Sequence, residues 1–149
     1  MNSLKSFTQK LDTARLEQAI TAAELRTSGE VRVVLQAGRV ADPTERAALE
    51  FKKLKMHETA ERNAVLFFVA PDARCFAVFG DQGVHAKCGD TFWQDVATAM
   101  EAHFKAGDPT AALVEGIGRA AELLAKEFPR QDDDRDELPN TIVERPADD

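Results

Sequence analysis

The sequence predicts an α/β fold, a three-layer α/β/α sandwich around a small mixed β-sheet. Stretches with helical periodicity alternate with short apolar runs, in the order helix, strand, helix, strand, strand, helix, helix. A helix joins the first two strands, so these should be parallel, whereas a short turn should make the third antiparallel to the second. With 149 residues, the chain has the length of one domain with a sizeable core.

The first half of the chain predicts two helices around one strand. Apolar residues recur at helical spacing over residues 4–27. Residues 30–36 then alternate between two faces, as a strand does. Asp42 and Pro43 are typical of a helix start, and this helix is expected to run to about Met56.

The second half predicts a hairpin followed by two helices. The apolar run over 64–70 favours a central strand that is buried on both faces, and residues 75–79 form its partner after a Pro-Asp turn. Asp90 is expected to cap a helix over 91–106. The last helix should begin at an Asp-Pro pair, Asp108-Pro109, and end near Phe128.

Charge is distributed unevenly along the chain. The net charge is −7, and residues 132–149 hold eight acidic and two basic residues, which places −6 in this segment and −1 in the rest. A neutral body with an acidic end argues against a nucleic-acid partner, because phosphate binding requires clustered Lys and Arg. It permits a cation partner.

Membrane and secreted classes are also disfavoured. No apolar run approaches the roughly 20 residues of a membrane span, and the first residues lack the apolar core of a signal peptide. Two cysteines, Cys75 and Cys88, are too few for a disulfide scaffold. We therefore expect a cytoplasmic location, where thiols stay reduced.

Common catalytic signatures are missing from the sequence. It contains no phosphate-binding GxxxxGK[ST] and no nucleophile elbow GxSxG. Asp132 and Asp134 have the D-x-D spacing of aspartyl-phosphate enzymes but follow a helix stop instead of a buried strand. His85 and Cys88 offer zinc-type ligands without a second ligand pair, so zinc is not favoured.

Polar residues should meet at one edge of the predicted sheet. Glu30 opens the first strand, and Arg62 and Asn63 open the second. Because the third strand runs the other way, Asp81 at its end should return to the same edge. We expect Glu30, Arg62 and Asp81 to converge there, with Arg62 paired to Glu30 as a structural ion pair.

Asp81 lies in the loop Gly80-Asp81-Gln82-Gly83 and allows two interpretations. The glycines would let the backbone bend so that Asp81 presents its carboxylate to a cation. Alternatively, Asp81 caps the segment that begins at Gly83. The residues alone leave both possibilities open.

The acidic run from Asp132 to Glu137 is similarly ambiguous. Calcium prefers six to eight oxygen ligands, which such a run can supply. An EF-hand match fails, because Glu137 replaces the required glycine and Val143 the bidentate glutamate. A solvated tail is the competing interpretation.

Several segments together resemble the TPM domain family, from about Leu16 to Pro139. The likeness rests on their joint order: Thr27-Ser28-Gly29-Glu30, Met56 to Asn63, Gly80-Asp81-x-Gly83, Phe92-Trp93, Phe128-Pro129 and Asp133-Asp134-Arg135-Asp136-Glu137-Leu138-Pro139. The resemblance predicts one TPM-like domain over residues 1–139, followed by a flexible acidic tail over 140–149.

The resemblance also implies a divalent-cation site at the sheet edge, with the acidic run folded back onto the Asp81 loop. It makes a set of carboxylates candidate metal ligands: Asp81, Asp133, Asp136, Glu137 and Glu30. Neighbouring residues would support them: Arg62, Asn63, Gly80 and Gly83. The expected cation is Ca²⁺, with Mg²⁺ as the alternative.

Two functions follow from this resemblance. The first is a non-catalytic interaction or accessory protein that binds the cation and a protein partner, such as a membrane-associated one. The second is a weak metal-dependent acid phosphatase acting on phosphomonoesters, in which Arg62 stabilises the phosphoryl charge and Asp81 is ligand or nucleophile. No activated nucleophile in the sequence supports the second.

Overall fold

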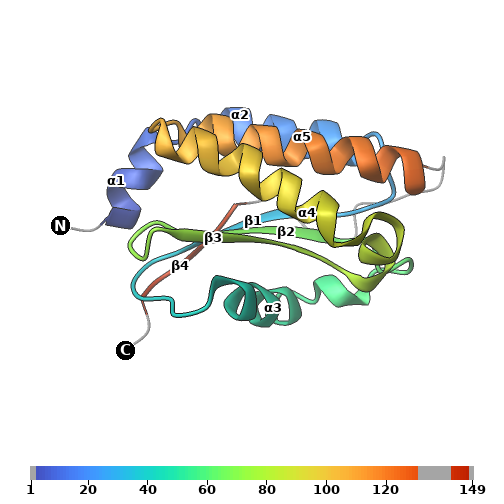
Figure 1. Ribbon diagram of the computed structural model, residues 1–149, viewed down its shortest axis with the longest axis horizontal. Coiled ribbons are helices and arrows are strands. Elements are labelled where there is room, and N and C mark those ends of the chain that lie inside the picture. The colour runs from blue at the N-terminus through green and yellow to red at the C-terminus, as the bar shows by residue number, and fades with distance from the viewer. Residues whose placement is uncertain (1–2, 131–141, 148–149) are drawn as a thin grey trace.

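The computed structural model describes residues 3–130 and 142–147. Its centre is a four-stranded mixed sheet with the strand order β3-β2-β1-β4 (Figure 1). The strands are β1 (Val31–Gln36), β2 (Val65–Ala70), β3 (Cys75–Gly80) and β4 (Val143–Arg145).

Helices cover both faces of this sheet, so the predicted three-layer α/β/α architecture is confirmed. The helices are α1 (Ser3–Lys10), α2 (Thr13–Glu24), α3 (Pro43–Lys53), η1 (Met56–Glu58, a 3-10 turn), α4 (Gln82–Lys105) and α5 (Pro109–Glu127). Figure 1 shows α3 and η1 below the sheet and the other helices above it. Within the described residues, no helix combines the length and apolar character that a bilayer crossing requires.

The strand directions agree with the prediction. β1 and β2 are parallel, with Val31 opposite Val65, and β2 and β3 are antiparallel, with Val65 opposite Gly80. All six residues of β2 are buried, because its alternating side chains enter two separate cores. Phe67 packs under the upper helices, and Phe68 packs against the α3 layer.

Aspartate caps set the starts of several helices. Asp42 accepts hydrogen bonds from the backbone N–H groups of Thr44 and Glu45, and Asp108 accepts one from Ala111. Each of these two caps is followed by proline at the first helical position, where its missing N–H costs no hydrogen bond. These signals explain why α3 and α5 begin where the sequence predicts.

Two helix predictions were too coarse. The helix expected over 4–27 is two helices, because Asp12 ends the first and caps α2 by accepting from Arg15 N–H. α4 begins at Gln82, well before the predicted start after Asp90, and is kinked at Gly89 (φ 72°). The prediction identified the segment after this kink and missed the one before it.

The expected acidic tail over 140–149 is wrong for residues 143–145, which form β4. This strand pairs in parallel with β1, with Val34 opposite Val143. The side chain of Arg145 binds the buried carboxylate of Glu50 on α3, at 3.1 Å to Oε1 and 3.3 Å to Oε2. A strand of three residues shows no periodicity of its own, so only its partners in the fold reveal it.

Candidate functional site

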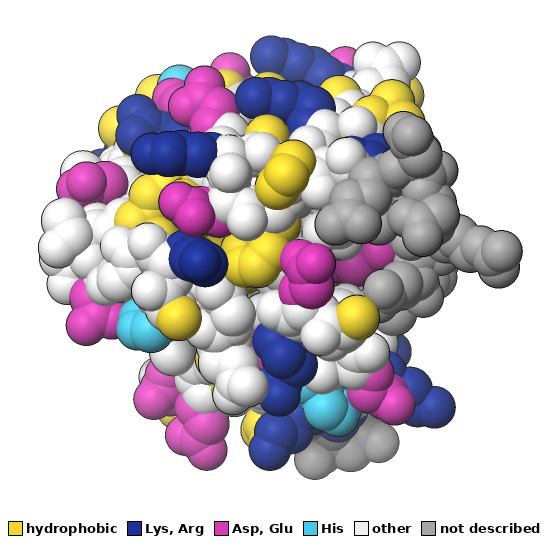
Figure 2. Space-filling view, turned by 90° about the vertical axis from the view of Figure 1, so that its right-hand side faces the viewer, with side chains coloured by type: hydrophobic (Ala, Val, Ile, Leu, Met, Phe, Trp, Pro, Cys, Tyr) yellow, Lys and Arg dark blue, Asp and Glu magenta, His cyan; other side chains and the backbone are white. Residues whose placement is uncertain are grey.

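The predicted polar edge is the end of the sheet at which β1 and β2 begin and β3 ends. Backbone hydrogen bonds join its three loops: Val65 N–H donates to Glu30 O (2.7 Å), and Asp81 N–H donates to Ala64 O (3.0 Å). Gly83 N–H donates to Arg62 O (2.9 Å). Glu30, Arg62 and Asp81 therefore lie at one edge, as the strand directions predict. Figure 2 faces this end of the molecule, where acidic and basic side chains are interspersed.

Arg62 binds Asp81, not Glu30 as predicted. Its Nε donates to Asp81 Oδ2 at 2.7 Å, and its Nη2 donates to Oδ1 at 2.9 Å. The hydrogen bond to Asp81 raises the pKa of Arg62. The fork matches both carboxylate oxygens, which gives the pair a fixed geometry. Arg62 pairs with Asp81 because β3 runs antiparallel to β2 and ends beside the residues that open β2.

Asp81 is also the N-cap of α4, one of the two roles that the sequence left open. Its Oδ1 accepts a hydrogen bond from Gln82 N–H at 2.8 Å, in addition to the bond from Arg62. A carboxylate has about four acceptor positions, and three are used here. Asp81 is 4% exposed, so it can offer a cation one lone pair at most while it keeps these partners.

Gly80 and Gly83 are needed for close packing, not for a tight bend as predicted. A Cβ at Gly83 would overlap the carbonyl oxygens of Glu61 and Arg62, the second at 2.6 Å. A Cβ at Gly80 would overlap the ring of Trp93. Gly83 thus lies directly against the backbone of the loop before β2, and Gly80 lies against a side chain of α4, so a larger residue at either position would push α4 away from the edge.

A second polar cluster at this edge was only partly anticipated. Asn63, which is buried, donates from Nδ2 to Ser28 Oγ (3.1 Å) and to Glu61 Oε2 (3.4 Å). Ser28 also donates to Glu61 Oε2 at 3.3 Å. Asn63 N–H is held by Thr59 Oγ1 at 3.2 Å. Glu61 was missed because nothing in its local sequence distinguishes it from an ordinary loop glutamate.

Buried charges lie behind these loops. Glu24 at the end of α2, Glu30 and Arg32 are each at most 6% exposed. Glu24 Oε2 accepts from Val31 N–H at 3.2 Å. Burial lowers the pKa of Arg32, and the charges of Glu24 and Glu30 oppose that change. Glu24 was not predicted, since its position in a helical pattern looks solvent-facing until α2 is packed against β1.

Three of the predicted ligands, Asp133, Asp136 and Glu137, lie outside the described residues. The residues that flank them are described. Arg130 N–H donates to Arg26 O at 3.4 Å, and its Nη1 donates to Glu24 O at 2.6 Å. On the other side, Ile142 precedes β4, and parallel pairing means that β4 is entered from the end at which β1 begins. Arg130 therefore lies at the end of the sheet that holds Glu30, whereas Ile142 leads into β4 beside the middle of β1, because Val143 pairs with Val34.

The described residues alone do not make a metal centre. Across residues 3–130 and 142–147, no three His, Cys, Asp or Glu side chains are grouped so that they could hold an ion. His85 contacts Asp90 at 3.3 Å on the exposed surface. Burial raises the pKa of Cys75 and of Cys88, so neither thiol is activated.

Comparisons with known proteins agree with this architecture. The NMR structure of the BA42 protein from the psychrophilic bacterium Bizionia argentinensis is 40% identical, with a TM-score of 0.81, over 90% of this chain and 94% of that one. The N-terminal domain of a protein from P. gingivalis is 18% identical, with a TM-score of 0.56 over 76% and 75% of the two chains, and is similar in fold alone. No curated protein matches. Residues 5–123 match the TPM domain, and the chain belongs to this family.

Proposed function

We propose that this TPM domain binds a divalent cation, Ca²⁺ in preference to Mg²⁺, and acts as a non-catalytic interaction or accessory protein. Glu30 and Asp81 would contribute from the sheet edge, and Asp133, Asp136 and Glu137 from the acidic segment. Ca²⁺ is favoured over Mg²⁺ because a flexible, carboxylate-rich oxygen set suits its larger and more variable shell.

One observation supports this proposal above the others. The chain enters the acidic segment at the end of the sheet where Glu24, Glu30 and Asp81 are already buried, and it returns from the segment alongside β1, where Val143 pairs with Val34. Bringing several more carboxylates to that end would be unfavourable without a counter-charge. A bound cation supplies such a charge. The described residues fit a hard cation in donor type, since the site offers oxygen atoms, but they do not provide enough ligands alone.

The proposed consequence of binding is a change in the surface offered to a protein partner, a membrane-associated one among the candidates. Binding that brings the acidic segment to the sheet edge would be coupled to the stability of the domain, because the cation would favour the folded state. At a cation concentration of 100 times Kd, this coupling adds about 2.7 kcal/mol. The free thiols of Cys75 and Cys88 suit a reducing cytoplasmic setting.

The phosphatase alternative has less support. It requires Arg62 to face a phosphoryl group, yet both of the guanidinium contacts described here go to Asp81. It also requires an activated nucleophile, and Asp81 is held by Arg62 and by the N-terminus of α4.

Calorimetric titration of Ca²⁺, and then Mg²⁺, into chelator-treated protein tests the proposal. We expect saturable binding of Ca²⁺ with a Kd on the order of 10⁻⁶ M. Replacing Asp133 and Asp136 with Asn and Glu137 with Gln should weaken it at least about tenfold, because ligand charge sets the affinity of such sites. Asp95→Asn on the exposed face of α4 is the matched control and should not change it.

Asp81→Asn separates ligand from scaffold roles. If Asp81 is a ligand, this variant weakens Ca²⁺ binding while Arg62→Gln, which spares the carboxylate, does not. Equal loss in both variants would assign Asp81 a structural role only. Absence of Ca²⁺ and Mg²⁺ binding to the unmodified chain would overturn the proposal. Turnover of a generic phosphomonoester that is lost in Asp81→Asn would favour the phosphatase instead.

A further inference from the structure

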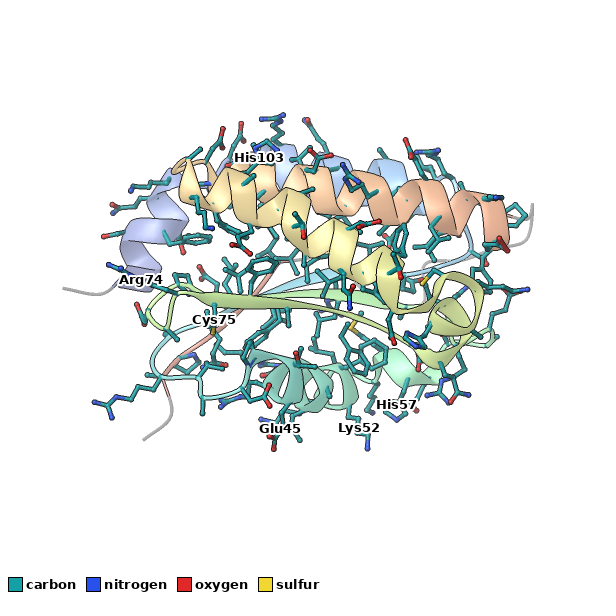
Figure 3. The ribbon with its side chains drawn as sticks, in the orientation of Figure 1. Glu45, Lys52, His57, Arg74, Cys75 and His103 are labelled. Carbon is teal, nitrogen blue, oxygen red and sulfur yellow. The ribbon has the colours of Figure 1, made fainter. Side chains whose placement is uncertain are left out.

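A groove lies at the opposite end of the sheet from the candidate cation site. It has a volume of about 910 Å³ and is formed by α1, by the turn between β2 and β3, and by the last turns of α4. Pockets for small ligands commonly have volumes of about 300–1,000 Å³. Figure 3 shows Arg74 at this end of the sheet, beside α1. The groove shares no residue with the polar edge described above.

The floor of the groove is apolar and aromatic. Phe7 of α1, Phe76 of β3 and Phe104 of α4 line it. The rings of Phe76 and Phe104 are tilted against each other, with centroids 5.0 Å apart. All three pack on the core under the upper helices. An aliphatic chain that covers this floor would remove both its own apolar surface and that of the phenylalanine rings from water.

The rim is basic although the protein is acidic. Lys10, Arg74 and Lys105 come from three different elements and line the groove, together with one acidic residue, Glu101. Glu101 Oε1 is 2.7 Å from Lys105 Nζ, so this acid is already paired. Among the described residues, no carboxylate lies within ion-pair distance of Lys10 or Arg74. The rim therefore keeps an excess positive charge on a chain with net charge −7.

The presence of the two lysines at the rim has a simpler explanation, but the presence of Arg74 does not. Lys10 and Lys105 lie in the last turns of helices, where cations complement the helix dipole. Arg74 closes the turn between β2 and β3 with a left-handed backbone (φ 55°). Gly, Asn or Asp is usual in this conformation, because a larger side chain is crowded there. Turn geometry thus disfavours arginine, yet an arginine stands here and lines the groove.

We propose that this groove binds a monomeric aliphatic carboxylate, with the chain on the phenylalanine floor and the head group beside Arg74 and the lysines. A hollow of this size can enclose a single hydrocarbon chain, whereas the flat surface of a bilayer would not enter it. Guanidinium is the group best matched to a carboxylate, because it donates two parallel hydrogen bonds. This inference does not depend on the proposed cation site.

The probe is sodium decanoate below its micelle concentration, titrated into ¹⁵N-labelled protein and followed by NMR. We expect shifts of the amides that surround the groove and a Kd on the order of 10⁻⁴ M, as the ligand efficiency of small ligands suggests. Decanol, which keeps the chain without the charge, and acetate, which keeps the charge without the chain, should each bind at least about fivefold more weakly.

Matched variants locate the head group. Arg74→Gln should weaken decanoate binding about threefold to tenfold, because it removes a charged hydrogen-bond donor at an exposed site. Lys52→Gln is the control, because Lys52 lies on α3 on the other side of the sheet (Figure 3) and carries the same charge. It should leave the affinity unchanged.

Three results would overturn the inference. Equal affinity for decanol and decanoate would show that the basic rim has no role. Equal weakening by Arg74→Gln and Lys52→Gln would indicate general charge attraction without a site. Sedimentation of the protein with phosphatidylglycerol vesicles, without any shift by decanoate, would assign the basic end to a membrane surface.

Discussion

Arg62 and Arg74 lie before and after β2, and they have the same uncommon backbone conformation in different surroundings. Their φ angles are 53° and 55°, in the left-handed region. Arg62 makes a forked contact with the buried carboxylate of Asp81, at 2.7 and 2.9 Å. Arg74 has no carboxylate within ion-pair distance among the described residues, and its side chain lines a groove.

The comparison shows how two ends of one sheet use the same residue differently. At the polar edge, charged hydrogen bonds offset the crowding of a left-handed arginine and connect β2 to the start of α4. At the groove end, the described contacts of Arg74 are a backbone hydrogen bond to Pro71 O at 3.1 Å and no carboxylate within ion-pair distance, so we expect the arginine to weaken the turn. Local strain without a local partner is a reason to look for a ligand.

The largest effect is expected where the polar edge is packed most tightly. Gly83→Ala should lower the free energy of unfolding by about 3 kcal/mol, because its Cβ would meet backbone carbonyls that cannot move away cheaply. Urea unfolding, followed by the fluorescence of the single tryptophan, Trp93, measures it.

Gly118→Ala is the matched control for that change. Its Cβ would have no atom of the described residues within 4 Å, on the exposed side of α5. Alanine is a better helix former than glycine, so this variant should gain about 0.5–1 kcal/mol. A similar loss in both variants would mean that tight packing at the edge does not set the stability of the domain.

Glycine at the two arginine positions should change stability in opposite directions. Arg74→Gly should raise the free energy of unfolding by about 0.5 kcal/mol, because relief of the left-handed backbone exceeds the added entropy of the unfolded chain. Arg62→Gly should lower it, since the forked contact with Asp81 is lost. Urea midpoints of the two variants and the parent chain decide this. A drop in both would show that Arg74 stabilises its turn.

The smallest expected effect is the pH dependence of an ion pair on Glu115, which lies outside both the polar edge and the groove. A hydrogen bond from His103, followed in size by one from Arg119, lowers the pKa of Glu115 below its ordinary value of 4.5. The hydrogen bonds of ionised Glu115 therefore contribute fully to the free energy of unfolding when the pH is above the ordinary pKa of this carboxyl. This contribution is lost as the pH falls through the lower pKa of the folded state. Because the pair is exposed, the loss should stay below about 0.5 kcal/mol.

Comparing Glu115→Gln with the parent chain by urea unfolding at a series of pH values checks this sign. The variant should be less stable near neutral pH, and the two curves should converge at acidic pH, where Glu115 is protonated. Convergence on raising the pH instead would contradict the assignment to Glu115.

Several elements were predictable because local signals and the fold agree. The apolar run of β2 could only be a buried strand, and Asp-Pro pairs fixed the starts of α3 and α5. The convergence of Glu30, Arg62 and Asp81 followed from strand direction alone. TPM family membership was also predictable from the sequence: the family match covers residues 5–123, which contain four of the six segments on which the resemblance rests.

Other features were not predictable, because their causes lie in distant residues. β4 is a strand because Val34 and Glu50 offer partners to Val143 and Arg145, not because its three residues favour extension. The choice of Asp81 over Glu30 by Arg62 depends on where β3 ends relative to β2.

By itself, the sequence determined the fold class, the strand directions and the residues that gather at the polar edge, because hydrophobic periodicity and turn length act locally. Only the tertiary structure decided which of those charges pair, since pairing depends on distances of about 3 Å that several elements set together. It alone brought Lys10, Arg74 and Lys105 to one groove, because these residues are far apart in the chain and meet only when α1, the hairpin turn and α4 pack around the sheet.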